Sequence, residues 1–132
     1  MGGHAVILLD THIFLWMNLE PEKLPQSVVD AIATEPTLGI AAISLWEIAM
    51  LVQYRRISIP DLSLQDWFRV TLLAPKLRLL PLSPEIASRS GILEMHGDPA
   101  DRLIAATALE HVCRLATADD KLIELDWLKT LS

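Results

Sequence analysis

The chain has little cysteine, few basic residues and no long apolar run. Cys113 is its single cysteine, which excludes an internal disulfide framework and any multi-cysteine zinc site. No apolar stretch reaches the roughly 18 to 20 residues that cross a membrane, and the first residues lack the basic region and long apolar core of a signal peptide. We therefore expect a soluble protein of the reducing cytoplasm.

Basic side chains are outnumbered by acidic ones. Lys and Arg together number 11 against 17 Asp and Glu, which gives a formal net charge of -6 at pH 7. A protein that binds nucleic acid by neutralising phosphates needs an excess of Lys and Arg. The composition therefore disfavours that class, although it allows an enzyme that holds nucleic acid through metal ions.

Apolar residues are plentiful. They make up 52% of the 132 residues, and the mean hydropathy is +0.36, so the chain has ample material for a core and is expected to fold. The length predicts one domain over residues 1–132. Because this apolar share is slightly high for so small a domain, we expect part of it to cover an interface between subunits.

Short apolar runs alternate with amphipathic segments along the chain. The predicted strands cover residues 5–9, 38–42, 77–82, 114–117 and 127–131. The predicted helices cover residues 11–18, 26–34, 44–51, 64–74, 84 to about 96, 99–109 and 121–125. The expected N-caps are Thr11, Ser44, Ser83 and Asp98. This alternation predicts an α/β fold, a three-layer α/β/α sandwich with a mostly parallel central sheet.

Carboxylates recur where the predicted strands end. Asp10 follows the first strand, Glu47 lies in the helix after the second, and Asp119 follows the fourth. Asp98 and Asp101 begin the helix that leads into the fourth strand. In parallel α/β sheets the carboxyl ends of the strands form the ligand-binding edge, where these acids should meet. Such oxygen donors suit Mg²⁺ or Mn²⁺, which could activate water and stabilise charge on a phosphate.

Several polar residues near these acids also have simpler interpretations. Asp98 and Asp119 could each cap a helix, and Glu47 stands at the acidic position of a capping box after Ser44. Arg102 shares a helix face with Asp98 and Asp101, so it could restrain a carboxylate or reach a phosphate. His12 is expected to pack or cap, because a metal ion makes a separate base unnecessary.

The larger and more reactive side chains are expected to be structural. Cys113 adjoins an apolar strand and should be a small core residue. The pair Arg55 and Arg56 is too short for a basic patch and fits a helix C-terminus. The tryptophans are interpreted as core or interface anchors rather than base-stacking platforms: Trp16, Trp46, Trp67 and Trp127.

Four segments, taken in order, resemble the motifs of one family. They are Leu-Leu-Asp-Thr-His at 8–12, Ser-Leu-Trp-Glu-Ile at 44–48, Asp-Pro-Ala-Asp-Arg-Leu-Ile-Ala-Ala-Thr-Ala at 98–108, and Leu-Ala-Thr-Ala-Asp at 115–119. Their order and spacing are similar to those of PIN-domain ribonucleases, most closely the VapC-type toxins of toxin-antitoxin modules. The third segment is the most specific, and the resemblance covers essentially the whole chain.

The resemblance implies a function and a set of site residues. It implies cleavage of RNA with Mg²⁺ or Mn²⁺ by a homodimer that a cognate antitoxin inhibits. The acids implied to carry catalysis and to bind metal are Asp10, Glu47, Asp101 and Asp119, with Asp98 as an extra metal ligand at the edge. The positions implied to support these carboxylates are Thr11, Ser44, Thr117 and Arg102.

Other functions remain open at this point. A phosphohydrolase of the haloacid dehalogenase type needs a second Asp where this chain has His12, and a response-regulator receiver needs an acidic pair and a late Lys that are not evident. A stand-alone PIN-like nuclease and a non-catalytic PIN-like binding scaffold both fit the motifs. Without the four implied ligands, thirteen acidic side chains would face eleven basic ones, so most of the acidic excess would belong to one metal site.

Overall fold

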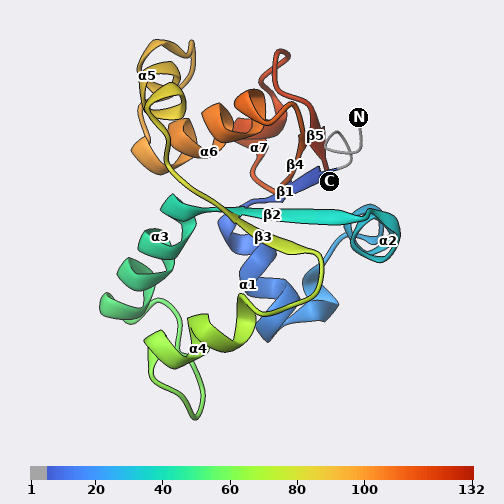
Figure 1. The fold of residues 1–132 in the computed structure, drawn as a ribbon, viewed down its shortest axis with the longest axis vertical. Helices are drawn as coiled ribbons and strands as arrows, with labels where there is room; N and C mark the ends of the chain where they lie inside the picture. Colours follow the sequence, from blue (N-terminus) through green and yellow to red (C-terminus); the bar gives the residue numbers. More distant parts are fainter. Residues whose placement is uncertain (1–5) are drawn as a thin grey trace.

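A sheet of five parallel strands forms the centre of the protein in a computed structural model that describes residues 6–132 (Figure 1). The strands are β1 (Val6–Leu9), β2 (Thr37–Ala41), β3 (Leu77–Leu80), β4 (Arg114–Ala116) and β5 (Thr130–Leu131). They lie in the order β3-β2-β1-β4-β5, and every neighbouring pair is parallel. The predicted α/β fold with a parallel sheet is confirmed. Ala5, predicted as the start of the first strand, lies outside the described residues.

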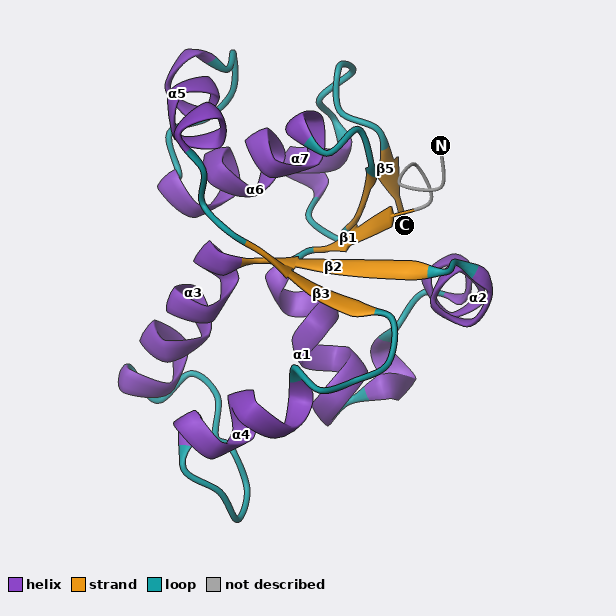
Figure 2. Cartoon of the chain, in the orientation of Figure 1, coloured by secondary structure: helices purple, strands orange, loops and turns teal. Residues whose placement is uncertain are grey.

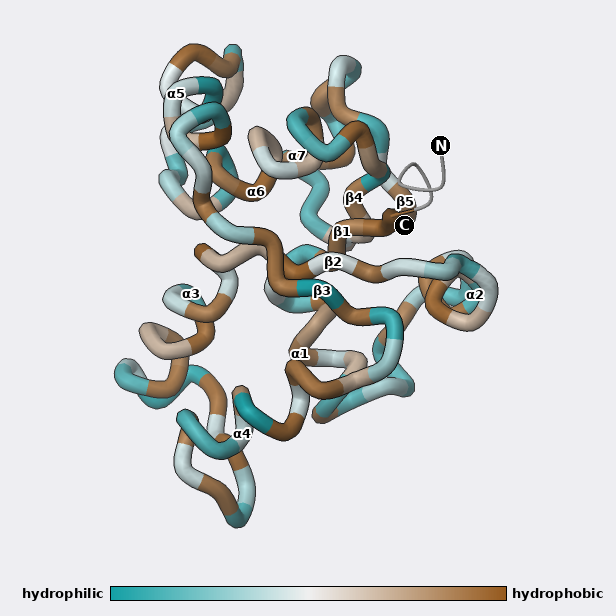
Figure 3. The backbone as a smooth tube through the Cα atoms, viewed as in Figure 1, coloured by the Kyte–Doolittle hydropathy of each residue, from teal (hydrophilic) through white to brown (hydrophobic). Residues whose placement is uncertain are grey.

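The central strand β1 is apolar on both of its faces. Ile7 and Leu9 belong to one core cluster and Leu8 to the other, as the alternation of side chains along a strand requires. All three side chains are buried, and their run is strongly hydrophobic in Figure 3. The residue that follows this strand, Asp10, is therefore held at the middle of the carboxyl edge of the sheet.

Helices cover both faces of the sheet (Figure 2). One layer holds α1 (Thr11–Leu19), α2 (Gln26–Thr34), α3 (Ala42–Gln53) and α4 (Leu64–Thr71), with the 3-10 turn η2 (Pro21–Lys23) between α1 and α2. The other layer holds α5 (Pro84–Ile92), α6 (Pro99–Glu110) and α7 (Asp120–Ile123). Phe14, Ile48 and Trp67 pack in the core of the first layer, and Ile104 and Leu122 in that of the second. These two cores give the predicted three layers.

Two of the predicted N-caps are wrong. Asp10, and not Thr11, caps α1, because the Asp10 side chain accepts the Thr11 N–H. The helix α3 begins at Ala42, directly after β2, and has no side-chain cap. Ser44 is consequently buried within the first turn, and Glu47 lies in the second turn instead of completing a capping box. The strand runs into the helix without a loop, which leaves no place for a separate capping residue.

The other two predicted N-caps are confirmed. Ser83 Oγ accepts the Ile86 N–H at 3.1 Å, and Asp98 Oδ1 accepts the Asp101 N–H at 3.0 Å. The ends of several elements differ from prediction: α4 ends at Thr71 and α5 at Ile92, and the last strand covers only Thr130–Leu131. Local periodicity identified these elements but did not fix their lengths.

Candidate metal centre

The acids predicted to share a site line one cavity at the carboxyl edge of the sheet. Asp10 lies after β1, Glu47 in α3, Asp101 in α6 and Asp119 after β4, and all four border a cavity of about 320 Å³. The same cavity is lined by further polar side chains from several elements: His12, His96, Asp98 and Lys121. The structure thus brings the predicted acids together from four distant parts of the chain.

Asp10 is almost completely buried at 3% exposure, yet both of its oxygens have donors. Oδ1 accepts the Thr11 N–H at 2.9 Å, and Oδ2 accepts the Thr117 hydroxyl at 2.6 Å. Burial raises the pKa of the Asp10 carboxyl above its ordinary value, while nearby His12 and these hydrogen bonds lower it. Asp10 is therefore a fixed carboxylate that a cation would stabilise in its charged form.

Glu47 is held by a pair of hydroxyl groups. The Thr11 hydroxyl donates to Glu47 Oε1 at 2.5 Å and lies 2.8 Å from Ser44 Oγ. Because Thr11 has one proton to give, Ser44 supplies the proton of the second bond. Burial raises the pKa of the Glu47 carboxyl, and Asp10, Asp101 and Asp98 raise it further. The buried Thr11 and Ser44 thus orient Glu47.

Asp101 is paired with a histidine that the sequence did not single out for this contact. His96 Nε2 lies 2.8 Å from Asp101 Oδ2. Burial raises the pKa of the Asp101 carboxyl, the bond from His96 lowers it, and neighbouring Asp98 raises it. His96 lies in the loop between α5 and α6, and nothing in the periodicity of that segment could have predicted its position.

Asp119 closes the cavity on the side of β4. Its side chain accepts the Lys121 N–H at 2.9 Å as the N-cap of α7, and its own N–H donates to Thr117 Oγ1 at 3.0 Å. Thr117 therefore contacts both Asp10 and Asp119, because its hydroxyl donates to the first and accepts from the second. This contact explains why a fully buried threonine follows β4.

Arg102 supports the site indirectly rather than by restraining a carboxylate itself. Its guanidinium does not contact a carboxylate among the described residues but donates to four backbone carbonyls. These carbonyls lie on the end of α5 and on the loop that follows: Ser90, Leu93, Met95 and His96. An arginine has five donors in a rigid fork, which suits it to gather several carbonyls. Arg102 fixes the loop that carries His96.

His12 packs as expected, but its hydrogen bond goes to a loop N–H before α7 and not to a helix end, and it also lines the site. Its Nε2 accepts the Ala118 N–H at 2.9 Å, and its ring stacks edge-on against Trp16 with centroids 5.0 Å apart. Its Nδ1 lies 3.5 Å from Asp10 Oδ2. Since Nε2 accepts a hydrogen bond, a ring hydrogen lies on Nδ1, the nitrogen that faces Asp10.

The donor set fits a hard divalent cation, although the carboxylates are not drawn to one point. Across residues 6–132, no three Asp, Glu, His or Cys side chains are close enough together to hold one ion. Each acid instead binds a protein donor, and burial raises the pKa of Asp10, Glu47 and Asp101. Oxygen ligands that repel one another in the absence of a cation are typical donors for Mg²⁺ or Mn²⁺.

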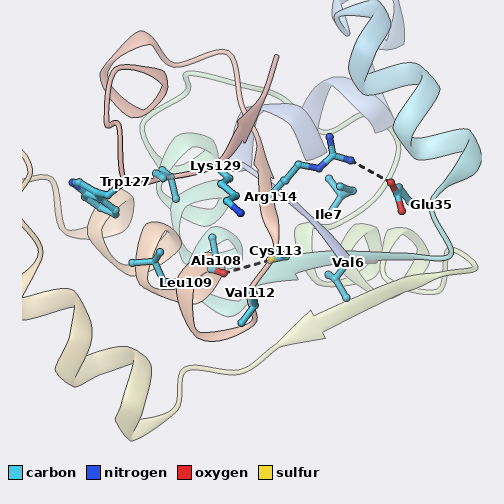
Figure 4. A pocket seen from close by; sticks show the side chains of 11 residues that line it. Val6, Ile7, Glu35, Ala108, Leu109, Val112, Cys113, Arg114, Trp127 and Lys129 are labelled. Carbon is cyan, nitrogen blue, oxygen red and sulfur yellow. Dashed lines mark hydrogen bonds and ion pairs between the residues drawn. The ribbon is translucent and has the colours of Figure 1, made fainter. Parts of the chain in front are cut away.

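A second cavity, of about 340 Å³, lies at the opposite edge of the sheet (Figure 4). It is lined by the amino ends of β1 and β4, and Arg114 spans it to pair with Glu35 at 3.2 Å. Burial raises the pKa of the half-buried Cys113 thiol to about 11, so this thiol stays protonated at neutral pH. The second cavity contains none of the predicted acids.

Comparison with known proteins identifies relatives over nearly the whole chain. The family model of the PIN domain matches residues 7–128. Ribonuclease VapC22 of Mycobacterium tuberculosis is 41% identical over 122 residues, which cover 89% of this chain and 90% of the relative. No helix in the described part of the chain is both long and apolar enough to cross a membrane.

Solved structures share the fold at lower identity. The chain is similar to one in the crystal structure of VapBC2 from Rickettsia felis bound to a promoter DNA fragment, with a TM-score of 0.70, 20% identity and coverage of 96% of this chain and 99% of that one. It is also similar to one in a toxin-antitoxin complex from Klebsiella pneumoniae, with a TM-score of 0.66, 21% identity and 96% coverage of both chains.

Proposed function

Because the chain belongs to the PIN-domain family, in its VapC-type branch, we propose that it is a metal-dependent endoribonuclease toxin. The observation that carries the proposal is the meeting of Asp10, Glu47, Asp101 and Asp119 around one cavity. A relative 41% identical to this chain is named a ribonuclease, which supports RNA as the substrate.

The residues of the cavity divide into groups that hold a cation and groups that orient them. Asp10, Glu47, Asp101 and Asp119 would hold Mg²⁺ or Mn²⁺, with Asp98 at the edge. When bound, such an ion activates water for attack on a phosphate and stabilises the charge that develops there.

Protein contacts preorganise these carboxylates. Thr117 holds Asp10 and Asp119 in a fixed relation, and Thr11 directs Glu47 toward the cavity. His12 lies beside Asp10, and Lys121 adds a positive charge to the cavity lining. Fixed hydrogen bonds of this kind limit the reorganisation that cation binding requires.

Substitution of Asp10 tests the proposal. Asp10→Asn keeps the size of the side chain and an oxygen for the Thr11 N–H, but removes the charge that a cation needs. We expect loss of Mg²⁺-dependent cleavage of single-stranded RNA, with an unchanged circular dichroism spectrum. Asp30→Asn, at an exposed position on α2, is the matched control and should cleave like the wild type. Cleavage by Asp10→Asn at the wild-type rate would refute the assignment.

We also propose that the protein forms a homodimer and is inhibited by a cognate antitoxin. Related folds occur in structures described as toxin-antitoxin complexes. Exposed apolar side chains support an interface between subunits, among them Leu82 before α5 and Ile92 at its last position, at 52% and 81% exposure. Light scattering should give the mass of a dimer, and Ile92→Glu should shift it toward the monomer if α5 lies in the interface.

A non-catalytic binding scaffold is the second candidate. The observation that favours it is the lack, among the described residues, of three side chains already close enough to hold one ion. Calorimetric titration with Mn²⁺ separates the two candidates. Binding that Asp10→Asn abolishes supports the nuclease, whereas the absence of binding to the wild type supports the scaffold.

A further inference from the structure

Three hollows in the surface join along α3. The acidic cavity, which is the first of the three, and a second hollow of about 270 Å³ on α3 share Glu47 and Leu51. This hollow is separate from the cavity beside Cys113. That second hollow and a third, of about 650 Å³, share Arg56. A row of adjoining hollows therefore leads from the carboxylates along α3 to the loop that follows the helix. We call it the α3 groove.

The wall of the α3 groove beside Glu47 carries two exposed aromatic side chains. Trp46 and Tyr54 are 52% and 70% exposed, whereas Trp67 in the core is 5% exposed. Trp46 is therefore not a core anchor, which reopens the base-stacking role that the sequence disfavoured. Trp46, Met50 and Tyr54 follow one another at intervals of four residues, so they form a stripe on one side of the helix. An exposed tryptophan costs hydrophobic burial and is not explained by the packing of α3 against the sheet.

The far end of the α3 groove carries two arginines beside apolar side chains. Arg55 and Arg56 follow Tyr54 where the chain reverses at the end of α3, and both line the third hollow. Neither arginine has an ion-pair partner anywhere in residues 6–132. The groove thus presents carboxylates, then aromatic rings, then two guanidinium groups.

We infer that the α3 groove binds the single-stranded RNA that flanks the scissile phosphate, an inference that rests on the proposed nuclease function. Aromatic rings stack on bases of any sequence, and arginines bind phosphates, so the two chemistries in alternation fit a nucleic-acid strand. Seven residues of helix separate Glu47 from Tyr54, a rise of about 10 Å. That length accommodates about three bases stacked at about 3.4 Å per nucleotide. Trp46 and Tyr54 would stack on bases, and Arg55 and Arg56 would contact phosphates.

Binding measurements without cleavage test the inference. The probe is a fluorescein-labelled single-stranded RNA of about 12 nucleotides, titrated by anisotropy in the Asp10→Asn background, which is expected not to cleave it. Adding Trp46→Ala or Tyr54→Ala should weaken binding about 5- to 150-fold each, the effect of losing one base stack. Trp46→Phe keeps a ring and should recover most of the affinity.

The arginines have a separate readout. Arg56→Gln should lower the slope of log affinity against log salt by about 0.7, the value for one phosphate contact on a single strand. Arg78→Gln is the matched control, since Arg78 is exposed on β3 and follows Leu77, which packs on the α3 side of the sheet. It should leave the slope unchanged.

The outcomes separate the groove from the nuclease. Wild-type cleavage together with undiminished binding by the Trp46 and Tyr54 variants would overturn the groove and leave the nuclease standing. Weakened binding by those variants, together with no RNA cleavage by the wild type, would support the groove and refute the nuclease. Unchanged RNA affinity with a lower mass in light scattering would assign this face to a second copy of the chain and overturn the inference.

Discussion

Arg102 shows how one side chain can position a loop without touching the chemistry. Its guanidinium donates to four carbonyls on the end of α5 and the following loop, and that loop carries His96 against Asp101. Lysine keeps the charge but has no planar fork that reaches several carbonyls at once.

Arg102→Lys should therefore lower the free energy of unfolding by about 2 to 3 kcal/mol, since hydrogen bonds to charged groups are among the stronger ones. Urea unfolding followed by circular dichroism measures this change. Arg89→Lys is the control, because Arg89 pairs with Glu110 at the surface and should lose no more than about 1 kcal/mol. Equal losses of unfolding free energy in the two variants would show that the contacts of Arg102 with the carbonyls do not stabilise the fold.

The sequence indicated which residues form the site, but it did not predict most of the contacts between their side chains. The motif resemblance selected the four acids, and the structure places them around one cavity. The resemblance also implied that Thr11 and Ser44 support the carboxylates, as their hydrogen bonds do. Which side chain each of them contacts, more than thirty residues away, is encoded by no local pattern. The same holds for Arg102, whose spacing on α6 pointed to carboxylates while its length allowed it to reach backbone carbonyls.

The C-terminal end of α6 holds one residue in a strained backbone conformation. The Cys113 N–H donates to the Ala108 carbonyl at 3.0 Å and the Val112 N–H to the Leu109 carbonyl at 3.2 Å, the bond pattern of a Schellman C-cap. Val112 occupies the left-handed position of that cap with φ of 50°, where glycine is favoured and a β-branched residue is strained.

Val112→Gly should raise the free energy of unfolding by about 1 kcal/mol, because Val112 is exposed and contributes little burial. Chemical denaturation measures the gain. Val112→Ala retains a Cβ and should gain less than glycine does. A loss of stability in the glycine variant would mean that the valine side chain contributes packing beyond its exposed position.

Asp98, at the N-terminus of α6, has two roles that substitutions can separate. Its Oδ1 caps the helix, and the residue also borders the acidic cavity. Asp98→Ser retains a good N-cap and removes the carboxylate, whereas Asp98→Ala removes both.

We expect Asp98→Ala to cost about 1 kcal/mol of stability and Asp98→Ser to cost a few tenths. Asp98 lies at the exposed rim of the cavity, so we expect it to contribute more to capping α6 than to binding a cation. Asp98→Ser should therefore cleave RNA at a rate within about threefold of the wild type. Thermal melts and RNA cleavage rates measure the two effects. Loss of cleavage in a stable Asp98→Ser variant would make Asp98 a required metal ligand.

Elements were predicted best where the signal is local. The helix predicted over 26–34 matches α2, and Ser83 and Asp98 cap α5 and α6 as their position before a proline suggests. Prediction failed where tertiary contacts decide: α3 begins without a loop after β2, and α5 ends early in the segment held by Arg102. Periodicity carries no information on such contacts.

At the scale of the whole molecule, the acidic centre couples stability to pH and to metal. Burial raises the pKa of Asp10, Glu47 and Asp101, so the folded state binds their protons more tightly than the unfolded state does. A raised folded pKa means that stability is lost as the pH rises from the unfolded value through the folded one. Without metal, these acids therefore destabilise the folded protein at neutral pH, and a divalent cation that compensates their charge removes the penalty.

Glu47→Gln isolates this effect, because glutamine retains an oxygen to accept the Thr11 hydroxyl while the repulsion from Asp10 and Asp101 is lost. In EDTA, at a pH below the ordinary glutamate pKa of 4.5, the variant and the wild type should have the same melting temperature. At pH 7.5 the variant should melt about 4 °C higher, which corresponds to about 1 kcal/mol for a chain of this size. Added Mg²⁺ should raise the melting midpoint of the wild type and leave that of the variant nearly unchanged.

Glu22→Gln, at an exposed position, is the control and should have the melting temperature of the wild type in every buffer. A variant less stable than the wild type in EDTA at every pH would show that Glu47 stabilises the fold by its hydrogen bonds, and that the acids of this centre do not strain the protein in the absence of a cation.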